Sequence, residues 1–242
     1  MSERDLPGPE HMEDFWDERA REDAFFFVDN RLEYRKPDVN RFWADGETDL
    51  RRLLQVAGVS IRPGDVIADI GCGVGRLTRA AKKLGAGSVL ALDVSQEMLE
   101  RAREYNAGLD GVTWVHGDGT SLGGIPDAVA DGVVSHVVFQ HIPDPHVTLG
   151  YVRDMGRVLK PGAWAAFQVS NDPDVHRPRK DPLKERLGRV FGRSPKGVED
   201  PAWLGSAVDL DDLRRVAAEG GMETERVEGA GTQFCIVCLR RT

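Results

Sequence analysis

The stretch VIADIGCGVGRLTRA, residues 66–80, decides the fold of this chain. Its first five residues form a short apolar run, which predicts a strand buried on both faces of a sheet. Three glycines follow within five positions, and after them apolar residues recur at helical spacing. The stretch therefore predicts a strand, a glycine loop and a helix in succession, an arrangement that suits a nucleotide-like cofactor. The glycines are Gly71, Gly73 and Gly75, and the helical apolar residues are Leu77, Ala80, Ala81 and Leu84.

The rest of the chain continues the alternation of strands and helices. Further strands are expected within residues 88–93, 112–118, 131–138 and 160–170, and helices within residues 95–105, 146–159 and 209–219. The last two strand-like runs, residues 222–231 and 232–241, have only a short turn between them, so they must pair antiparallel. We therefore expect an α/β fold with a doubly wound, seven-stranded sheet that is mostly parallel, with one antiparallel strand near the C-terminus.

The composition limits the classes of function. The chain has 242 residues, of which 40% are hydrophobic, enough for one sizeable core. Its formal net charge of −8 argues against a broad nucleic-acid-binding surface. No apolar run approaches the roughly 20 residues that span a bilayer, and the charged N-terminus lacks the apolar region of a signal peptide. We expect a soluble, cytoplasmic protein whose partner is a small molecule and neither a nucleic acid nor a membrane.

The three cysteines, Cys72, Cys235 and Cys238, indicate a reducing compartment and not a disulfide scaffold. The last two form CIVC, which has the spacing of a metal or redox pair. They lie in a run that predicts a strand, where positions i and i+3 point to opposite faces. We therefore expect two separate core thiols.

Two segments lie outside the alternating pattern. Residues 1–55 contain eight of the seventeen aromatic residues of the chain, which is unlike a disordered tail. We expect this segment to be a helical cap that either packs on the core as an ordinary layer or also serves as a lid over the site, with residues 56–242 forming the main domain. Residues 171–208 form an insertion over the site, which holds eight Lys and Arg against two acidic residues between His176 and Gly197. It is either a solvated loop or an electropositive flap for an anionic substrate.

The glycine loop and its neighbours carry the chemistry. The spacing Gly71-x-Gly73-x-Gly75 differs from the G-x-G-x-x-G of dinucleotide-binding folds. Asp69 lies two positions before the first glycine, where a carboxylate would repel a pyrophosphate and suit a ligand with an ammonium group. Asp93 ends the second strand and can accept hydrogen bonds from ribose hydroxyls. Asp118 ends the third strand, and because these strand ends share one edge of the sheet, the three carboxylates favour a single ligand.

Five stretches together resemble the class I S-adenosylmethionine-dependent methyltransferases of the small-molecule type. They are DIGCGVGRLT, LALDVSQEML, HGDGTSL, DGVVSHVVFQHIPDP and RVLKPGAWAAF. The resemblance covers about residues 60–170 and extends to the closing strand pair. It implies a Rossmann-like fold and S-adenosylmethionine (SAM) as the cofactor, and it does not identify the methyl acceptor.

The resemblance also implies which residues contact the cofactor. The positions of Asp69, Gly71 and Gly73 line the methionine part, and that of Asp93 holds the ribose. The adenine contacts and the end of the fourth strand complete the expected cofactor site, which adds Val94, Met98, Asp118, Gly119 and Ser135.

Two histidines are candidates for a general base. Transfer of a methyl group to a hydroxyl requires removal of the hydroxyl proton, and histidine suits that role near neutral pH. His136 directly follows Ser135, and His141 follows five residues later; we slightly favour His141. A divalent metal at His146 and Asp144 is possible but not favoured.

The expected activity is methylation of a small polar metabolite, with O-methylation of a sugar or secondary-metabolite hydroxyl favoured. N-methylation of a small molecule is the nearest alternative. An NAD-dependent oxidoreductase is the alternative from another class, although the glycine spacing, Asp69 and the closing antiparallel pair argue against it.

Overall fold

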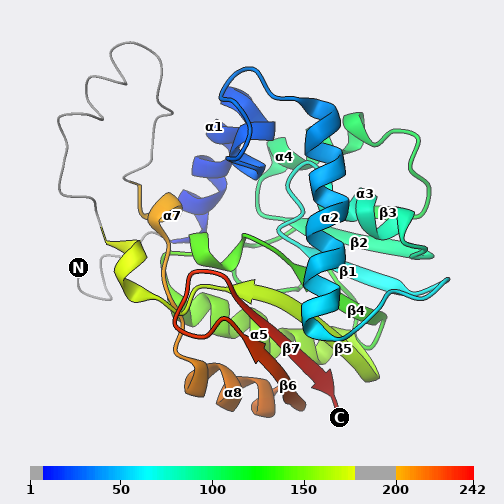
Figure 1. The fold of residues 1–242 in the computed structure, drawn as a ribbon, viewed down its shortest axis with the longest axis vertical. Coiled ribbons are helices and arrows are strands. Elements are labelled where there is room, and N and C mark those ends of the chain that lie inside the picture. Colours follow the sequence, from blue (N-terminus) through cyan, green and yellow to red (C-terminus); the bar gives the residue numbers. More distant parts are fainter. Residues whose placement is uncertain (1–7, 178–199) are drawn as a thin grey trace.

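The structure is a computed structural model that describes residues 8–177 and 200–242. A seven-stranded sheet in the order β3-β2-β1-β4-β5-β7-β6 forms its centre (Figure 1). β1 to β5 pair in parallel, whereas β7 runs antiparallel between β5 and β6. The expected α/β fold with a mostly parallel sheet is therefore confirmed. The strands are β1 (Val66–Ile70), β2 (Ser88–Asp93), β3 (Val112–His116), β4 (Ala130–Ser135), β5 (Leu159–Val169), β6 (Met222–Glu228) and β7 (Cys235–Arg241).

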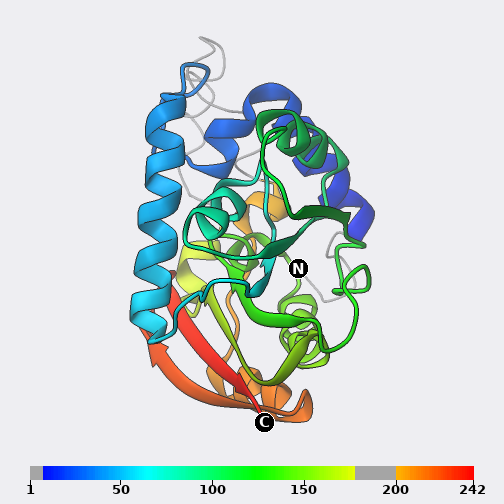
Figure 2. The same ribbon diagram turned by 90° about the vertical axis from the view of Figure 1, so that its right-hand side faces the viewer.

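Helices cover both faces of this sheet. One hydrophobic cluster joins the sheet to α5 and α8, and a second joins the opposite face to α2, α3 and α4. Figure 2 shows α2 running along one side of the sheet. The helices are α1 (Pro9–Val28), α2 (Val39–Ala57), α3 (Arg76–Lys83), α4 (Gln96–Tyr105), α5 (Pro145–Val158), α7 (Pro201–Leu204) and α8 (Leu210–Glu219), with the 3-10 helices η2 (Phe139–His141) and η3 (Pro173–His176).

The cysteine pair of β7 illustrates how the sheet divides the core. Cys235 packs in the cluster with α5 and α8, and Cys238 packs in the cluster with α2 and α3. All three cysteines are free and buried. The strand geometry thus places the two thiols of CIVC on opposite faces, in agreement with the sequence prediction.

The N-terminal segment forms two helices with different positions. α2 buries Leu50, Leu53 and Leu54 among residues of the sheet and α3, so it is one of the helices of that layer. α1 instead lies near α4 at the edge where the parallel strands end (Figure 1). Asp17 of α1 stabilises the contact between α1 and α4, because its Oδ1 accepts hydrogen bonds from Ser95 Oγ (2.6 Å) and from the backbone N–H of Glu97 (3.1 Å).

The proposed insertion at residues 171–208 is only partly within the structure. Most of its basic residues lie outside the described residues, in 178–199. The described flanks are η3 and the short helix α7, which lies beside η2. Within residues 8–177 and 200–242, no helix is long and apolar enough to cross a membrane.

Candidate active site

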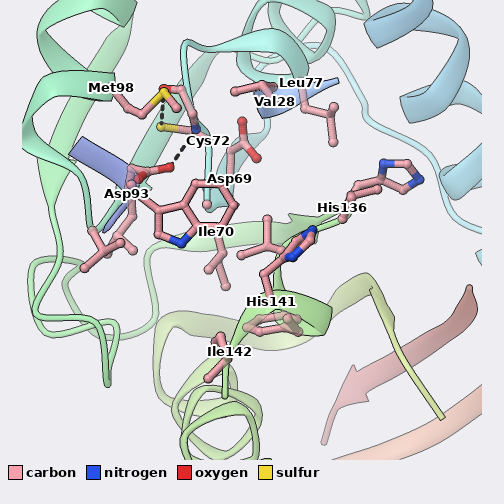
Figure 3. Close-up of a pocket in the computed structure, with 18 of the residues that line it drawn as sticks. Val28, Asp69, Ile70, Cys72, Leu77, Asp93, Met98, His136, His141 and Ile142 are labelled. Atoms are coloured by element: carbon pink, nitrogen blue, oxygen red, sulfur yellow. Dashed lines mark hydrogen bonds between the residues drawn. The ribbon is translucent and has the colours of Figure 1, made fainter. Parts of the chain in front are cut away.

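The pocket of interest opens at the carboxyl ends of the parallel strands, where the sheet order changes direction between β1 and β4. Its wall combines the glycine loop after β1, the end of β2, the segment after β4 and the inner side of α1. In Figure 3, Asp93 and His136 lie at opposite ends of this pocket, with Asp69 between them. The pocket therefore has two ends that can take different parts of a ligand, or two ligands.

The glycine loop approaches its neighbours too closely for side chains. Gly71 and Gly73 have φ values of +69° and +52°, in the left-handed region. A Cβ on Gly71 would lie 2.4 Å from the methyl groups of Val138, and one on Gly73 would lie 2.7 Å from Val28 Cγ2. The loop can therefore keep its path only with glycine at these positions, and its backbone forms an open wall of the pocket.

Asp93 is buried at the end of β2 and lines the pocket. Its Oδ2 accepts a hydrogen bond from the backbone N–H of Gly73 (2.7 Å), and its Oδ1 accepts one from that of Ser95 (2.9 Å). Burial raises the pKa of this carboxyl group, and the backbone hydrogen bonds oppose the rise. Because a carboxylate has about four acceptor positions, Asp93 keeps capacity for two hydroxyl groups of a ligand.

Asp69 is the second buried carboxyl group of the pocket. Thr78 Oγ1 donates a hydrogen bond of 2.6 Å to its Oδ2. Burial, together with the nearby charge of Asp93, raises the pKa of Asp69 to about 6. Two neighbouring buried carboxyl groups make this end of the pocket electronegative, which favours a ligand that carries a positive charge.

Three further expected cofactor residues, Val94, Met98 and Gly119, also line the pocket. Asp118 and Ser135 are not among its lining residues. The Asp118 carboxylate instead accepts hydrogen bonds within its own turn, from the backbone and hydroxyl groups of Thr120 and Ser121. The Ser135 hydroxyl is buried and donates to the backbone oxygen of Ile70 (2.9 Å).

His141 lines the pocket, and both of its ring nitrogens have partners. Nδ1 lies 2.8 Å from the backbone oxygen of Trp203 in α7, and Nε2 lies 3.2 Å from Nε2 of Gln140. A carbonyl oxygen only accepts, so the proton is on Nδ1 and Nε2 accepts from the Gln140 amide. Gln168 in turn donates to Oε1 of Gln140 (2.9 Å), which fixes the orientation of that amide. Burial lowers the pKa of His141 to about 4.

His136 also lines the pocket but has a different environment. Its Nδ1 is buried and has no hydrogen-bond partner among the described residues. Burial, helped by the positive charge of Arg76, lowers the pKa of His136 to about 4. The ring is therefore neutral near pH 7, and its buried Nδ1 has no hydrogen-bond partner among the described residues.

Several lining residues had no counterpart in the sequence analysis. α1 contributes Met12, Trp16, Phe27 and Val28, and the first residue of α3 contributes Arg76. The density of aromatic residues in the first 55 positions indicated that this segment packs on the core, but no periodic pattern distinguished the side chains that face the pocket. No pattern singled out Arg76.

An aromatic cluster surrounds His141. The ring centroid of Trp203 lies 5.2 Å from that of His141, 5.7 Å from that of Phe27 and 6.3 Å from that of Trp16. Trp203 of α7 therefore packs against His141 and against two α1 residues that line the pocket. Among the described residues, no group of three or more His, Cys, Asp or Glu side chains is arranged to hold a metal ion, so His146 and Asp144 belong to no such group.

Comparisons with known proteins agree with this geometry. A family model described as a methyltransferase domain matches residues 68–167. A demethylmenaquinone methyltransferase of Staphylococcus aureus is 26% identical over 229 residues, which cover 87% of this chain and 90% of the relative.

Solved structures show the same fold. An S-adenosylmethionine-dependent methyltransferase from Mesorhizobium loti matches with a TM-score of 0.60 and 24% identity, over 81% of this chain and 99% of that one. Magnesium protoporphyrin IX methyltransferase from Synechocystis, solved with bound S-adenosylhomocysteine (SAH), matches with a TM-score of 0.62 and 18% identity, over 97% of this chain and 100% of that one.

The matched domain contains the glycine loop, Asp69, Asp93 and both pocket histidines. The residues fit SAM, since the pocket offers hydrogen-bond acceptors for two hydroxyl groups at one place and negative charge for a cationic ligand at another. Residues 68–167 therefore form a methyltransferase domain, and the chain is a methyltransferase that uses SAM as its cofactor.

Proposed function

We propose that the enzyme transfers the methyl group of SAM to a hydroxyl oxygen of a small molecule, with His136 as the general base. The observation that carries this proposal is the buried Nδ1 of His136, which lines the pocket and has no partner among the described residues. His141, the other candidate, already uses both ring nitrogens in hydrogen bonds. Because both nitrogens of His141 are hydrogen-bonded, we assign His141 the role of shaping the pocket and holding α7. His136 is then the candidate for the base.

The cofactor contacts are part of the same proposal. Asp93 would accept from the ribose hydroxyls, and Asp69 would face the ammonium group of the methionine part, with Gly71 and Gly73 forming the wall between them. Val94, Met98 and Gly119 would surround the adenine. Asp118 and Ser135 would act indirectly, because Asp118 holds the turn before Ser121 and Ser135 holds the end of β1.

When bound, SAM supplies a methyl group on a positively charged sulfur atom. His136 would accept the hydroxyl proton at Nδ1 while the acceptor oxygen takes the methyl group that SAM supplies. The α1 residues Trp16 and Phe27 exclude water and hold the acceptor near the donor, which is the main requirement of such a transfer.

The basicity of His136 limits which hydroxyl it can serve. A base whose conjugate acid has a pKa of about 4 is unprotonated at neutral pH but is a weak proton acceptor. It therefore suits an acidic hydroxyl such as a phenol, with a pKa of roughly 10, better than the less acidic hydroxyl of a sugar. The apolar side chains Val28, Leu77 and Val138, which line the pocket, would also fit an aromatic ring. We therefore favour a phenolic secondary metabolite over a sugar.

A second candidate acceptor follows from the relative. The Staphylococcus aureus protein is named as a demethylmenaquinone methyltransferase, and it aligns with 87% of this chain. The apolar wall of the pocket would also accommodate a quinone-type ring. Methylation of such a ring is therefore the second candidate function, and N-methylation of an amine, which needs no strong base, is the third.

The test is a methyl-transfer assay with isotope-labelled SAM against phenols, sugars, amines and demethylmenaquinone. With the best acceptor, His136→Asn should lower kcat by about 100-fold or more, the usual size of general-base catalysis, and leave the affinity for SAH unchanged within threefold. His141→Asn is the matched control, because its amide N–H can still donate to the Trp203 carbonyl, and it should retain more activity. Full turnover by His136→Asn would overturn the proposal.

A further inference from the structure

A cluster of charged side chains, three of them largely buried, lies beside the pocket and close to His136. Arg76 begins α3 directly after the glycine loop, and only 4% of its side chain is exposed. Its Nη1 lies 2.5 Å from Asp49 Oδ2 in α2 and 3.7 Å from Asp29 Oδ2, at the end of α1. Arg31 also pairs with both carboxylates. The two arginines and two aspartates balance, so the cluster is neutral as a unit.

Arg76, which lines the pocket, keeps unused hydrogen-bonding capacity. Both of its ionic contacts use Nη1. Nε is buried and has no hydrogen-bond partner within residues 8–177 and 200–242, although a guanidinium group carries five N–H donors. Arg76 is also a lining residue of the pocket. A buried, unpaired donor of this kind is costly unless a ligand satisfies it.

The position of Arg76 relative to Asp69 indicates which ligand group it takes. The charge of Arg76 is close enough to lower the pKa of the buried Asp69 carboxyl group, against the effects of burial and of Asp93. Both side chains line the same pocket. This part of the pocket therefore presents a carboxylate and a guanidinium together, which is complementary to a zwitterionic amino acid and not to a single charge.

We propose that Arg76 binds the carboxylate of the amino-acid part of SAM through its unpaired Nε and the adjoining N–H groups. An arginine is suited to this contact because its planar fork matches a carboxylate. Asp29 and Asp49 hold the guanidinium in place, so they are positioning residues. The proposal concerns the cofactor alone. Arg76 also lies close enough to His136 for its charge to lower the pKa of that ring, so the test measures cofactor binding and not turnover.

The arrangement also connects the cofactor to both N-terminal helices. Asp29 directly follows Val28, whose side chain contacts the glycine loop at Gly73. Asp49 belongs to α2. A ligand carboxylate on Arg76 therefore adds to a network that joins the end of α1, the middle of α2 and the start of α3.

The experiment compares two cofactor analogues by isothermal titration calorimetry on the full chain. SAH carries the amino-acid part, whereas 5′-methylthioadenosine has the same adenosine and a thioether but lacks it. Arg76→Met should weaken SAH binding by about 10- to 100-fold, the range for losing a hydrogen bond to a charged group. The affinity for 5′-methylthioadenosine should change by less than threefold.

Arg79→Met is the matched control. Arg79 lies one helical turn further along α3, outside the pocket lining, with its guanidinium 3.7 Å from the centre of the Trp43 ring. This variant should bind both analogues as the wild type does. Arg76→Lys serves as a second variant, because it keeps a cation for Asp49. It should weaken SAH binding less than Arg76→Met does, and it should leave the affinity for 5′-methylthioadenosine unchanged.

The ratio of the dissociation constants for SAH and 5′-methylthioadenosine shows whether Arg76 binds the amino-acid part of the cofactor. If Arg76→Met is not folded, as judged by circular dichroism, Arg76→Lys is decisive on the same ratio. A selective loss of SAH affinity supports the proposal. Equal weakening of both analogues, or no change in either, would show that Arg76 only shapes the site, and would overturn the proposal.

Discussion

Replacement of Gly71 by alanine should damage both folding and cofactor binding. An L-residue at φ +69° costs about 1–2 kcal/mol in the left-handed region. The added Cβ would also lie 2.4 Å from both methyl groups of Val138, and such overpacking typically costs about 1–3 kcal/mol. We therefore expect Gly71→Ala to lower the free energy of unfolding by about 2–5 kcal/mol.

A matched glycine separates the two contributions. Gly64 has φ +91° but no neighbouring atom within 4 Å of an added Cβ. Gly64→Ala should therefore lower the free energy of unfolding only by the cost of the backbone conformation, about 1–2 kcal/mol. Adding Val138→Ala to Gly71→Ala removes the clashing methyl groups and should recover about 1–3 kcal/mol.

Urea denaturation measures the stability of each variant, and calorimetric titration with SAH measures binding. Gly71→Ala should weaken SAH binding at least tenfold because the loop must shift, whereas Gly64→Ala should leave binding unchanged. The reasoning is refuted if Gly71→Ala is no less stable than Gly64→Ala and binds SAH with wild-type affinity.

Further predictions concern ionisable groups and the attachment of α1. Because burial holds the pKa of His136 at about 4, kcat/KM should show no inflection from this residue between pH 6 and 8; an inflection lost in His136→Asn would contradict the low pKa. The pKa of His141 is also lowered to about 4 in the folded protein. As the pH falls, His141 is therefore protonated in the unfolded chain before it is protonated in the folded one. The free energy of unfolding should decrease between about pH 6.5 and pH 4, by up to about 1.4 kcal/mol per pH unit. His141→Gln should lack this component, which denaturation at pH 7 and pH 4.5 would reveal. Burial raises the pKa values of all three cysteine thiols, so an aromatic disulfide reagent should label the folded protein far more slowly than the unfolded one. Asp17→Ala removes the acceptor of two hydrogen bonds from α4 and should speed proteolysis within α1 while the sheet stays folded.

The fold was predictable because local patterns and sheet rules agree. Short apolar runs alternate with helical periodicity, and the turn between the last two strands is too short for a crossover, which requires the antiparallel pairing that β6 and β7 show. The same strand geometry placed Cys235 and Cys238 on opposite faces. The glycine loop was recognisable because close approach of the backbone excludes other residues there.

The environments of Arg76, His136 and His141 were less predictable because they depend on long-range packing. Arg76 follows the glycine loop directly, but its ion pairs come from Asp29 and Asp49, which are far away in the sequence. The partners of His141 come from its neighbour Gln140 and from Trp203, 62 positions further along the chain. No spacing rule predicts such contacts, so the sequence could not rank His136 and His141 by their available nitrogens.

The most direct test of the proposed reaction is to identify the atom that receives the methyl group. The enzyme would be incubated with SAM labelled with ¹³C in the methyl group and the best phenolic acceptor, and the product examined by ¹³C NMR and mass spectrometry, in parallel with the His136→Asn variant. We predict a methyl group bonded to oxygen with wild-type enzyme and loss of that product in the variant, with SAH binding retained. A methyl group on nitrogen or carbon, or an undiminished yield from His136→Asn, would contradict the account.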